Sequence, residues 1–586
     1  MKSFLKFTLA TIVGILALNL IGFIFLMIFV GISTKADVPD VEEHSVLLAR
    51  FNKPIMDRAN DNPLAQFMSG NLGIDGMMGL DQIIKDIEKA KSDENIDGIF
   101  LDLSTIPAGM ATLEEIRDAL EDFRESEKFI LAHADMYTQK TYYLASVADK
   151  VYMTPTGDFS FSGLSSEVTF FKHTLDKLGI DMQVIRHGSY KSAVEPLMKD
   201  ELSEENREQI DALITSLWDQ MVSGIAVSRS IPEEDLNQYA DQVALAFDDQ
   251  ALEKGMLDGL KYYDEVLDEL RERTETEEDD DVPAISLKKY KNVPASGKKE
   301  PTRNTIAVIY AMGNVVLGDA DEGTIGSDRI AKAIRKARED DKVKAIVFRV
   351  NSGGGSSLAS EVIYREAKLA AEKKPFVASL GDVAASGGYY IVCPADTIVS
   401  SENTITGSTG VFGVLPNMKE LMNDKLGITV DVVKTNTHAD MGSVFRSLTP
   451  EERMMIQSYV DDVYQNFAQR VAEGRNMTYD EVNAIGGGRV WSGEDAMRVG
   501  LIDVFGGLDK SIAIAAEMAG LDNYNTRSLP ALEDPFTAIM KELSGDIRTR
   551  IIKKEMGTSY HYYQQLEEVK NMDGIQARMP FSIYIY

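Results

Sequence analysis

A serine flanked by small residues is the first place in this chain where residue types and spacing could support chemistry. Ser386 lies between two alanines and two glycines in the stretch 381–391, Gly-Asp-Val-Ala-Ala-Ser-Gly-Gly-Tyr-Tyr-Ile. The pattern predicts a strand, a tight turn and a helix, with the hydroxyl beside the free N–H groups of the first helical turn. Those groups can bind a developing oxyanion, and Gly387 leaves room for a substrate. The same pattern also fits an ordinary helix N-cap, so the rest of the chain must decide.

A hydroxyl needs a proton acceptor to become a nucleophile. The base for this serine is less obvious than the serine itself. None of the six histidines lies in a motif that would mark it as the base. A Ser-His-Asp triad built from distant residues and a Ser-Lys pair both remain open. Lys191 stands out because it closely follows an apolar strand at 182–185, and burial can lower the pKa of a lysine. A solvent-exposed lysine is the ordinary alternative.

The elements that would position these residues occur twice along the chain. Strand-like segments alternate with helices of about 10–15 residues, which predicts a layered α/β fold. Segment 94–103 matches segment 341–350 at an offset of 247 (341 − 94), and further identities follow at nearly the same offset. We therefore predict a tandem duplication of one α/β domain, with an N-terminal repeat at 44–270 and a C-terminal repeat at 305–526.

The serine and the lysine fall in different copies of this domain. Ser386 corresponds to Gln139 (386 − 139 = 247), and Lys191 corresponds to Ala439 (439 − 191 = 248). The glycine-rich turn at 351–357 is also lost in the first copy. A turn needed only by the fold would have been kept in both copies, so we expect a site formed between a first and a second repeat. The sequence leaves open whether those repeats belong to one chain.

Three segments lie outside the two repeats. Residues 7–34 carry no charge and are nearly all apolar, which predicts one membrane-spanning helix within residues 1–35. Basic residues before it and acidic residues after it place the N-terminus in the cytoplasm. Residues 271–304 combine an acidic run with lysines and prolines, which is typical of a charged linker. Residues 527–586 are expected to be a C-terminal tail, either an arm that packs on a neighbouring chain or a frayed terminus.

Composition disfavours several classes of function. The chain has 586 residues and a net charge of −32, which argues against nucleic acid and anionic lipid as direct partners. A single cysteine, Cys393, permits no intrachain disulfide. No histidine lies in a metal-binding motif or pairs with cysteine. We therefore expect neither a metal site nor another cofactor.

Four motifs carry a resemblance to a known family. They are Gly-Ser-Tyr-Lys-Ser-Ala-Val-Glu-Pro (188–196), Arg-Val-Asn-Ser-Gly-Gly-Gly (349–355), Asp-Val-Ala-Ala-Ser-Gly-Gly-Tyr-Tyr (382–390) and Thr-Gly-Ser-Thr-Gly-Val-Phe-Gly (406–413). In this order they resemble the signal peptide peptidase A (protease IV) family of serine peptidases, in its long, duplicated form. The resemblance covers about residues 40–525 and the N-terminal apolar segment. It implies a fold similar to the Clp protease subunit and the crotonases. The family usually has proline where this chain has Gly353, which leaves the N–H groups of the turn in place.

The resemblance implies a role for five residues. Ser386 matches the nucleophile and Lys191 the general base. Backbone N–H groups of Gly354 and Gly387 would form the oxyanion hole, and Ser408 would hydrogen-bond the lysine amine. By the same resemblance we expect a membrane-anchored endopeptidase that acts through an acyl-enzyme and degrades cleaved signal peptides. It would work on the extracytoplasmic side of a bacterial inner membrane, as a homo-oligomer such as a tetramer.

Two other classes of function compete with this one. A crotonase-like enzyme acting on acyl-CoA would use a similar oxyanion hole, but a net charge of −32 suits a polyanionic cofactor poorly. A membrane scaffold that kept the fold without activity is the other alternative. Assays on peptides and on acyl-CoA thioesters, with a serine-directed probe, separate the three.

Overall fold

The computed structural model describes residues 38–59, 77–295, 301–532 and 575–579, with isolated positions between residues 6 and 21. Most of the expected membrane-spanning segment, and most of the expected tail, therefore lie outside the described residues. Among the residues that the structure describes, no helix has both the length and the apolar run needed to cross a bilayer.

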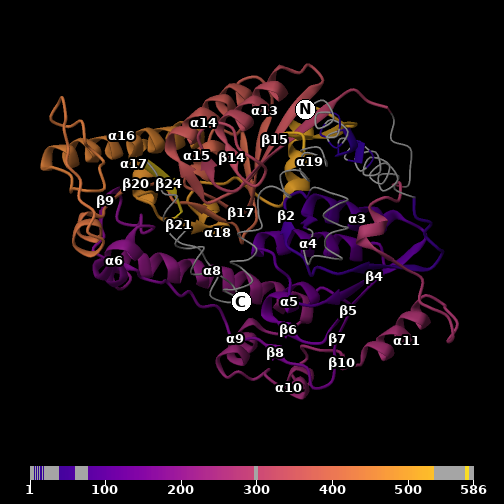
Figure 1. Ribbon diagram of the computed structural model, residues 1–586. Helices are drawn as coiled ribbons and strands as arrows, with labels where there is room; N and C mark the ends of the chain where they lie inside the picture. Colours follow the sequence, from indigo (N-terminus) through magenta and orange to yellow (C-terminus); the bar gives the residue numbers. More distant parts are fainter. Residues whose placement is uncertain are drawn as a thin grey trace.

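The N-terminal repeat is a parallel sheet covered by helices, drawn in violet to magenta in Figure 1. Its strands lie in the order β10-β7-β5-β4-β1-β11, and every pair is parallel. The strands are β1 (Ser45–Ala49), β4 (Ile96–Leu103), β5 (Phe129–Ala134), β7 (Lys150–Met153), β10 (Gly259–Leu260) and β11 (Ala284–Ser286). The principal helices are α3 (Leu80–Ser92), α4 (Met110–Arg124), α5 (Gln139–Ala145), α8 (Glu204–Arg229), α9 (Glu233–Asp241), α10 (Asp248–Glu253), α11 (Tyr263–Arg273) and α12 (Leu287–Tyr290).

The C-terminal repeat builds its own sheet in the same way and lies above the first repeat in Figure 1. Its main order is β21-β19-β17-β15-β12-β23, with β18 beside β17 and β22 beside β18. The strands are β12 (Thr305–Met312), β15 (Val343–Ser352), β17 (Phe376–Ala385), β18 (Thr397–Ser400), β19 (Ile405–Gly407), β21 (Val490–Ser492), β22 (Val504–Phe505) and β23 (Asn525–Leu529). The helices are α13 (Ser327–Glu339), α14 (Ser357–Ala371), α15 (Gly387–Val392), α16 (Pro450–Arg475), α17 (Tyr479–Ile485), α18 (Gly493–Arg498) and α19 (Leu508–Met518).

The two sheets share one topology, which confirms the predicted α/β duplication. The order β11-β1-β4-β5-β7-β10 in the first repeat corresponds to β23-β12-β15-β17-β18-β22 in the second. Central strands such as β15 are almost continuously buried and largely apolar, as expected for parallel strands covered on both faces. Each repeat has a hydrophobic core of its own.

A smaller sheet, here called the bridging sheet, contains strands from both repeats in the order β14-β13-β16-β24-β20-β9. β9 (Asp181–His187) of the first repeat pairs antiparallel with β20 (Val411–Asn417) of the second. β24 (Ile575–Arg578) lies between β20 and β16 (Gly354–Ser356), antiparallel to both. Shorter elements complete the described chain: β2 (Ile55–Met56), β3 (Met78–Gly79), β6 (Tyr137–Thr138), β8 (Phe159–Ser160), β13 (Val315–Val316), β14 (Ile325–Gly326), α6 (Lys172–Leu178), α7 (Glu195–Met198) and the π-helix η1 (Leu421–Lys425).

Two expected boundaries differ from the structure. The segment 271–304, expected to be a charged linker, contains β11 and α12, and its Tyr290 is fully buried. The segment 527–586, expected to be a tail, begins inside β23. β11 pairs with β1 as β23 pairs with β12, so the two strands are equivalent edges of the two sheets. Both are short and partly exposed, so they lack the apolar run that identifies the central strands.

Candidate active site

Ser386 lies at the turn between β17 and α15, where the sequence predicted a strand, a turn and a helix. Its φ is 55°, a left-handed conformation that side-chain-bearing residues rarely adopt. Its N–H donates to the Gly407 carbonyl at 2.7 Å, and its carbonyl accepts from the Tyr390 N–H at 2.8 Å. The hydroxyl makes no capping hydrogen bond, although the side chain is fully buried. An ordinary N-cap is therefore excluded, and a strained, buried serine at a turn suits a functional role.

Lys191 reaches this turn from the first repeat of the same chain. Its Nζ lies 2.8 Å from Ser386 Oγ and 3.0 Å from Ser408 Oγ. All three side chains are fully buried. Burial lowers the pKa of Lys191 well below its ordinary value, because the charged amine loses its hydration. The structure thus brings together a hydroxyl and an amine that can be neutral and accept its proton.

The loop that carries Lys191 is held by its neighbours on both sides. Arg186, at the end of β9, donates from Nη1 to the Lys191 carbonyl at 3.0 Å. Gln209 of α8 donates to the carbonyl of Tyr190 at 3.1 Å. On the side of the second repeat, a Cβ on Gly488 would lie only 2.6 Å from the Lys191 Cα. The main chains of the two repeats can approach this closely only because position 488 has no side chain.

Ser408 is placed to orient the amine. Its hydroxyl donates to the Gly488 carbonyl at 3.2 Å, so the oxygen lone pairs are free to accept from Lys191 Nζ. Its backbone N–H donates to the Arg489 carbonyl at 2.6 Å, which fixes the turn. Ser408 therefore contacts the amine that the resemblance implied it would orient, and the orienting role itself stays a prediction.

Backbone N–H groups beside Ser386 come from two turns. Gly387 begins α15, and a Cβ placed on it would lie 3.1 Å from the nitrogen of Gly355. The N–H of Gly354, which the resemblance assigned to the oxyanion hole, instead donates to Ser352 Oγ at 3.1 Å. The structure therefore favours Gly355 over Gly354 as the partner of Gly387. The sequence could not distinguish adjacent glycines, because the choice depends on which N–H the Ser352 hydroxyl engages.

Helix α4 of the first repeat supports two strands that end at this site. Thr112 donates its N–H and its hydroxyl to the carboxylate of Asp382 in β17, at 2.9 and 2.7 Å. Arg349 of β15 donates to Glu115 of α4 and to Asp57, both at 2.6 Å. Arg349 is fully buried, so this network joins the repeats away from solvent. These contacts join residues far apart in the chain, so no local pattern in the sequence predicts them.

A buried serine in contact with a buried lysine amine, on a duplicated α/β fold, defines a hydrolase of the serine type. Comparison with known proteins gives the family. The model of Peptidase family S49 matches residues 122–277 and 368–522, one segment in each repeat. The chain belongs to this family of serine peptidases, and this membership argues against a crotonase-like acyl-CoA enzyme.

Three curated relatives support this assignment over most of the chain. Serine protease SPPA, chloroplastic, of Arabidopsis thaliana is 32% identical over 550 residues, covering 92% of this chain and 78% of the relative. Protease 4 of Salmonella typhi is 37% identical over 482 residues, covering 80% and 76%. Protease 4 of Haemophilus influenzae is 33% identical over 482 residues, covering 76% and 73%. The predicted resemblance to the protease IV family is thereby confirmed.

A solved structure, that of a ClpP1 mutant from Listeria monocytogenes, also matches part of the chain. It covers 35% of this chain and 94% of its own, with 13% identity and a TM-score of 0.24. This TM-score is too low to establish a shared fold, so the likeness to the Clp protease subunit stays a prediction.

Proposed function

We propose that the protein is an endopeptidase whose catalytic dyad, Ser386 and Lys191, forms between the two repeats of one chain. The observation that carries the proposal is the 2.8 Å contact between Nζ and Oγ, both fully buried. Burial favours the neutral amine, and only a neutral amine has a lone pair to accept the serine proton.

The geometry supports a complete acyl-transfer cycle. Lys191 accepts the proton of Ser386 while Oγ attacks the scissile carbonyl carbon, and the N–H groups of Gly355 and Gly387 stabilise the oxyanion. A donor of this kind typically lowers the barrier by about 3–4 kcal/mol. Protonated Lys191 then gives its proton to the leaving amine as the C–N bond breaks. Water, deprotonated by Lys191, hydrolyses the serine ester, and Ser408 keeps the amine in place throughout.

The substrates and setting that we propose are those implied by the resemblance. Residues 1–35 would anchor the enzyme in a bacterial inner membrane, with both repeats on the extracytoplasmic side, where it would degrade cleaved signal peptides. The uncharged segment 7–34 supports the anchor, and the flanking charges support this orientation. The relatives named Protease 4 and SPPA support peptide substrates. Assembly into a homo-oligomer such as a tetramer belongs to the same proposal.

Labelling of the nucleophile tests the proposed function most directly. A fluorophosphonate probe should modify wild-type protein at Ser386, identified by peptide mapping, and should not modify the Ser386→Ala variant. The same variant should lose casein hydrolysis while its circular dichroism spectrum is unchanged. Ser400→Ala is a matched control, because this serine is also fully buried but donates its hydroxyl to the Ser401 carbonyl. Labelling of the Ser386→Ala variant, or normal casein hydrolysis by it, would refute the dyad.

A further inference from the structure

Gln209 of helix α8 contacts the chain on both sides of Lys191. This glutamine is 1% exposed. Its Nε2 donates to the Tyr190 carbonyl at 3.1 Å and to Ser192 Oγ at 2.9 Å. Tyr190 and Ser192 are the two neighbours of Lys191 in the sequence. One carboxamide therefore holds residues 190–192, here called the lysine loop, on either side of the proposed base.

The oxygen of the same carboxamide contacts the second repeat. Gln209 Oε1 accepts from the N–H of Val490 in β21 at 3.2 Å. Val490 pairs with Gly407 of β19, the residue before Ser408. The carbonyl of Arg489, the residue before Val490, accepts from the Ser408 N–H at 2.6 Å. Gln209 thus joins the lysine loop to the strand that borders the serine in contact with the lysine amine.

A neighbouring residue on α8 fixes which way this carboxamide points. Asn206 is 2% exposed and donates from Nδ2 to the buried carboxylate of Glu195 at 3.0 Å. Its Oδ1 is therefore the atom that accepts from Gln209 Nε2, at 2.9 Å. The nitrogen of Gln209 then faces the lysine loop and its oxygen faces β21. A buried polar network of this kind is rigid when all of its members are hydrogen-bonded.

The equivalent helix of the second repeat shows that the fold does not need this residue. Figure 1 shows α8 in magenta and α16 in orange, and both helices have 26 residues. Gln209 and Met455 lie at the same position in the two helices (209 − 204 = 455 − 450 = 5). Met455 is 52% exposed. A buried amide at this position is therefore particular to the repeat that carries Lys191.

The lowered pKa of Lys191 depends on how well the lysine loop excludes water. Its physical cause is burial, because the charged amine would lose its hydration. The charged groups on the surrounding elements are paired with one another: Arg186 and Lys199 with Glu195, Arg489 with Glu208, and His187 with Asp461. A loop that opened towards solvent would let water reach the amine and would raise its pKa.

We propose that Gln209 is a positioning residue of the dyad, which holds the lysine loop against β21 and so keeps the amine in contact with Ser386 Oγ and out of water. The inference rests on the proposed function and adds to it a residue outside the four motifs. Gln209 acts through the main chain beside Lys191 and not on the substrate. Displacement of a catalytic group by about 1 Å can slow a reaction about 100-fold, so a small movement of this loop is sufficient.

Labelling of Ser386 by a fluorophosphonate, measured as a rate from pH 7 to pH 10, tests this inference on the full chain. Gln209→Met keeps the length of the side chain and removes its hydrogen bonds. It should slow labelling about tenfold or more at pH 7. The difference from wild type should narrow as pH rises, because alkaline solution restores the neutral amine. A loss of equal size at every pH would indicate a merely structural role and would overturn the inference.

Gln220→Met is the matched control. Gln220 lies on the same helix and also contacts the second repeat, with Nε2 2.9 Å from Glu494 Oε2, but it does not flank Lys191. This variant should be labelled like wild type at every pH. Equal labelling rates of wild type and Gln209→Met at pH 7 would refute the inference and leave the proposed function standing. If wild type is neither labelled at Ser386 nor able to hydrolyse casein, the proposed function itself fails.

A second variant keeps the test decisive if Gln209→Met does not fold, as judged by circular dichroism. Ser192→Ala removes one of the acceptors of Gln209 Nε2 and leaves the contacts with Tyr190 and Val490 in place. It should slow labelling at pH 7 less than Gln209→Met does, with the same narrowing as pH rises. Labelling of Ser192→Ala at the wild-type rate throughout this range would contradict a positioning role for the network.

Discussion

The loops that precede α8 and α16 occupy corresponding places in the two repeats but are organised in opposite ways. Both helices have 26 residues. The loop before α8 carries Lys191, which is fully buried and has a lowered pKa because it is removed from water. The corresponding residue before α16 is Ala439, which is exposed. The proposed chemical role therefore falls to only one of the two loops.

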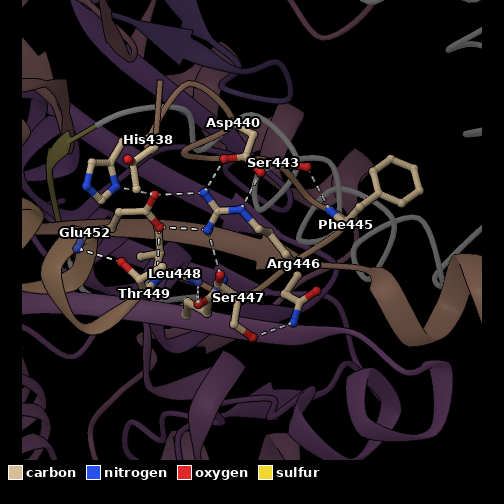
Figure 2. Close-up of polar contacts among 12 residues, drawn as sticks. His438, Asp440, Ser443, Phe445, Arg446, Ser447, Leu448, Thr449 and Glu452 are labelled. Carbon is tan, nitrogen blue, oxygen red and sulfur yellow. Dashed lines mark hydrogen bonds and ion pairs between the residues drawn. The ribbon is translucent and has the colours of Figure 1, made fainter. Parts of the chain in front are cut away.

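Charge pairing organises the second loop, as Figure 2 shows. Arg446 lies between two carboxylates, with Nη2 2.9 Å from Asp440 Oδ1 and Nη1 2.7 Å from Glu452 Oε2. The guanidinium group lowers the pKa of both carboxyls below their usual range. Glu452 also accepts from the N–H of Thr449, the N-cap of α16, so the cluster ties the loop to its helix. One loop thus buries an amine away from water, and the other holds charged groups by pairing them.

The turns at the nucleophile position differ in a similar way. In the first repeat Thr138 is an ordinary N-cap of α5, and its Oγ1 accepts from the Thr141 N–H at 3.2 Å. Gln139, which corresponds to Ser386, donates to the Gly163 carbonyl at 2.9 Å. The first repeat therefore has the capped turn that the sequence also allowed for Ser386. The comparison shows that the strained serine and the buried lysine are not required by the fold, since each has an unstrained counterpart.

Exchange of the two loop residues should give the largest effect. Lys191→Ala should lower kcat for peptide hydrolysis about 10⁴-fold, because no other titratable side chain contacts Ser386 Oγ in the part of the chain that the structure describes. Ala439→Lys should leave activity unchanged, because that position is exposed to solvent. The double variant should stay as inactive as Lys191→Ala alone. Recovery of activity in the double variant would show that either loop can supply the base and would contradict the difference between the two loops. Thermal unfolding by circular dichroism is the control for folding.

The pH dependence of kcat/KM should reflect the burial of Lys191 and not a pairing with a charged group. Below the lowered pKa of Lys191, kcat/KM should rise about tenfold per pH unit, because only the neutral amine acts as the base. Burial and contact with Glu402 raise the pKa of Glu114 to about 8, so this group also titrates in the accessible range. Glu114→Gln is the control and should keep the rising profile. A profile with its maximum below neutral pH would contradict a lysine base.

The free energy of unfolding should also rise with pH, because Lys191 is buried. The pKa of Lys191 is lower in the folded than in the unfolded chain, so between the two values the unfolded chain binds one more proton. Burying Lys191 therefore lowers the free energy of unfolding at pH values below its unfolded pKa of about 10.4. This cost decreases as pH rises from the folded pKa to the unfolded pKa. Lys191→Met should be more stable than wild type at pH 7, and the difference should shrink by pH 10. Urea unfolding at both values measures it, and a less stable variant at pH 7 would contradict the burial cost.

The sequence was sufficient to predict the parts of this molecule that local pattern determines. The duplicated sheets follow from long apolar strands, and Ser386, Lys191 and Ser408 lie in compact motifs. β24 was not predictable, because its four residues are recruited by the backbone edges of β16 and β20 rather than by any side-chain pattern. The choice between Gly354 and Gly355 could not be made from the sequence for a related reason, since it depends on which N–H the hydroxyl of Ser352 engages. Contacts such as Arg349 with Asp57 depend on how the repeats dock and leave no local signal.

Corresponding positions on β15 and β4 offer a smaller test of how differently the repeats use charge. Arg349 corresponds to Asp102 (349 − 102 = 247). Arg349→Met would leave two carboxylates buried without their partner, and we expect a loss of about 3–5 kcal/mol of unfolding free energy. Asp102 pairs with Arg50, which is 51% exposed, so Asp102→Asn should cost at most about 1 kcal/mol. Urea unfolding compares the two, and similar small losses would mean that the buried network does not join the repeats energetically.

The smallest effect is expected from the charge cluster in Figure 2. Arg446→Met should change peptide hydrolysis less than twofold, because the cluster belongs to the loop that carries no catalytic group. The variant should melt at a lower temperature than wild type at pH 7. Asp440 and Glu452 have lowered pKa values in the folded chain because they pair with Arg446. They therefore stabilise the fold fully above their unfolded pKa values of about 4, and this stabilisation is lost as pH falls through their folded pKa values. The difference in melting temperature should therefore narrow in acid, and Glu452→Gln should behave likewise. Loss of hydrolysis comparable to that of Lys191→Ala would show that both loops serve the reaction, and the division between them would no longer hold.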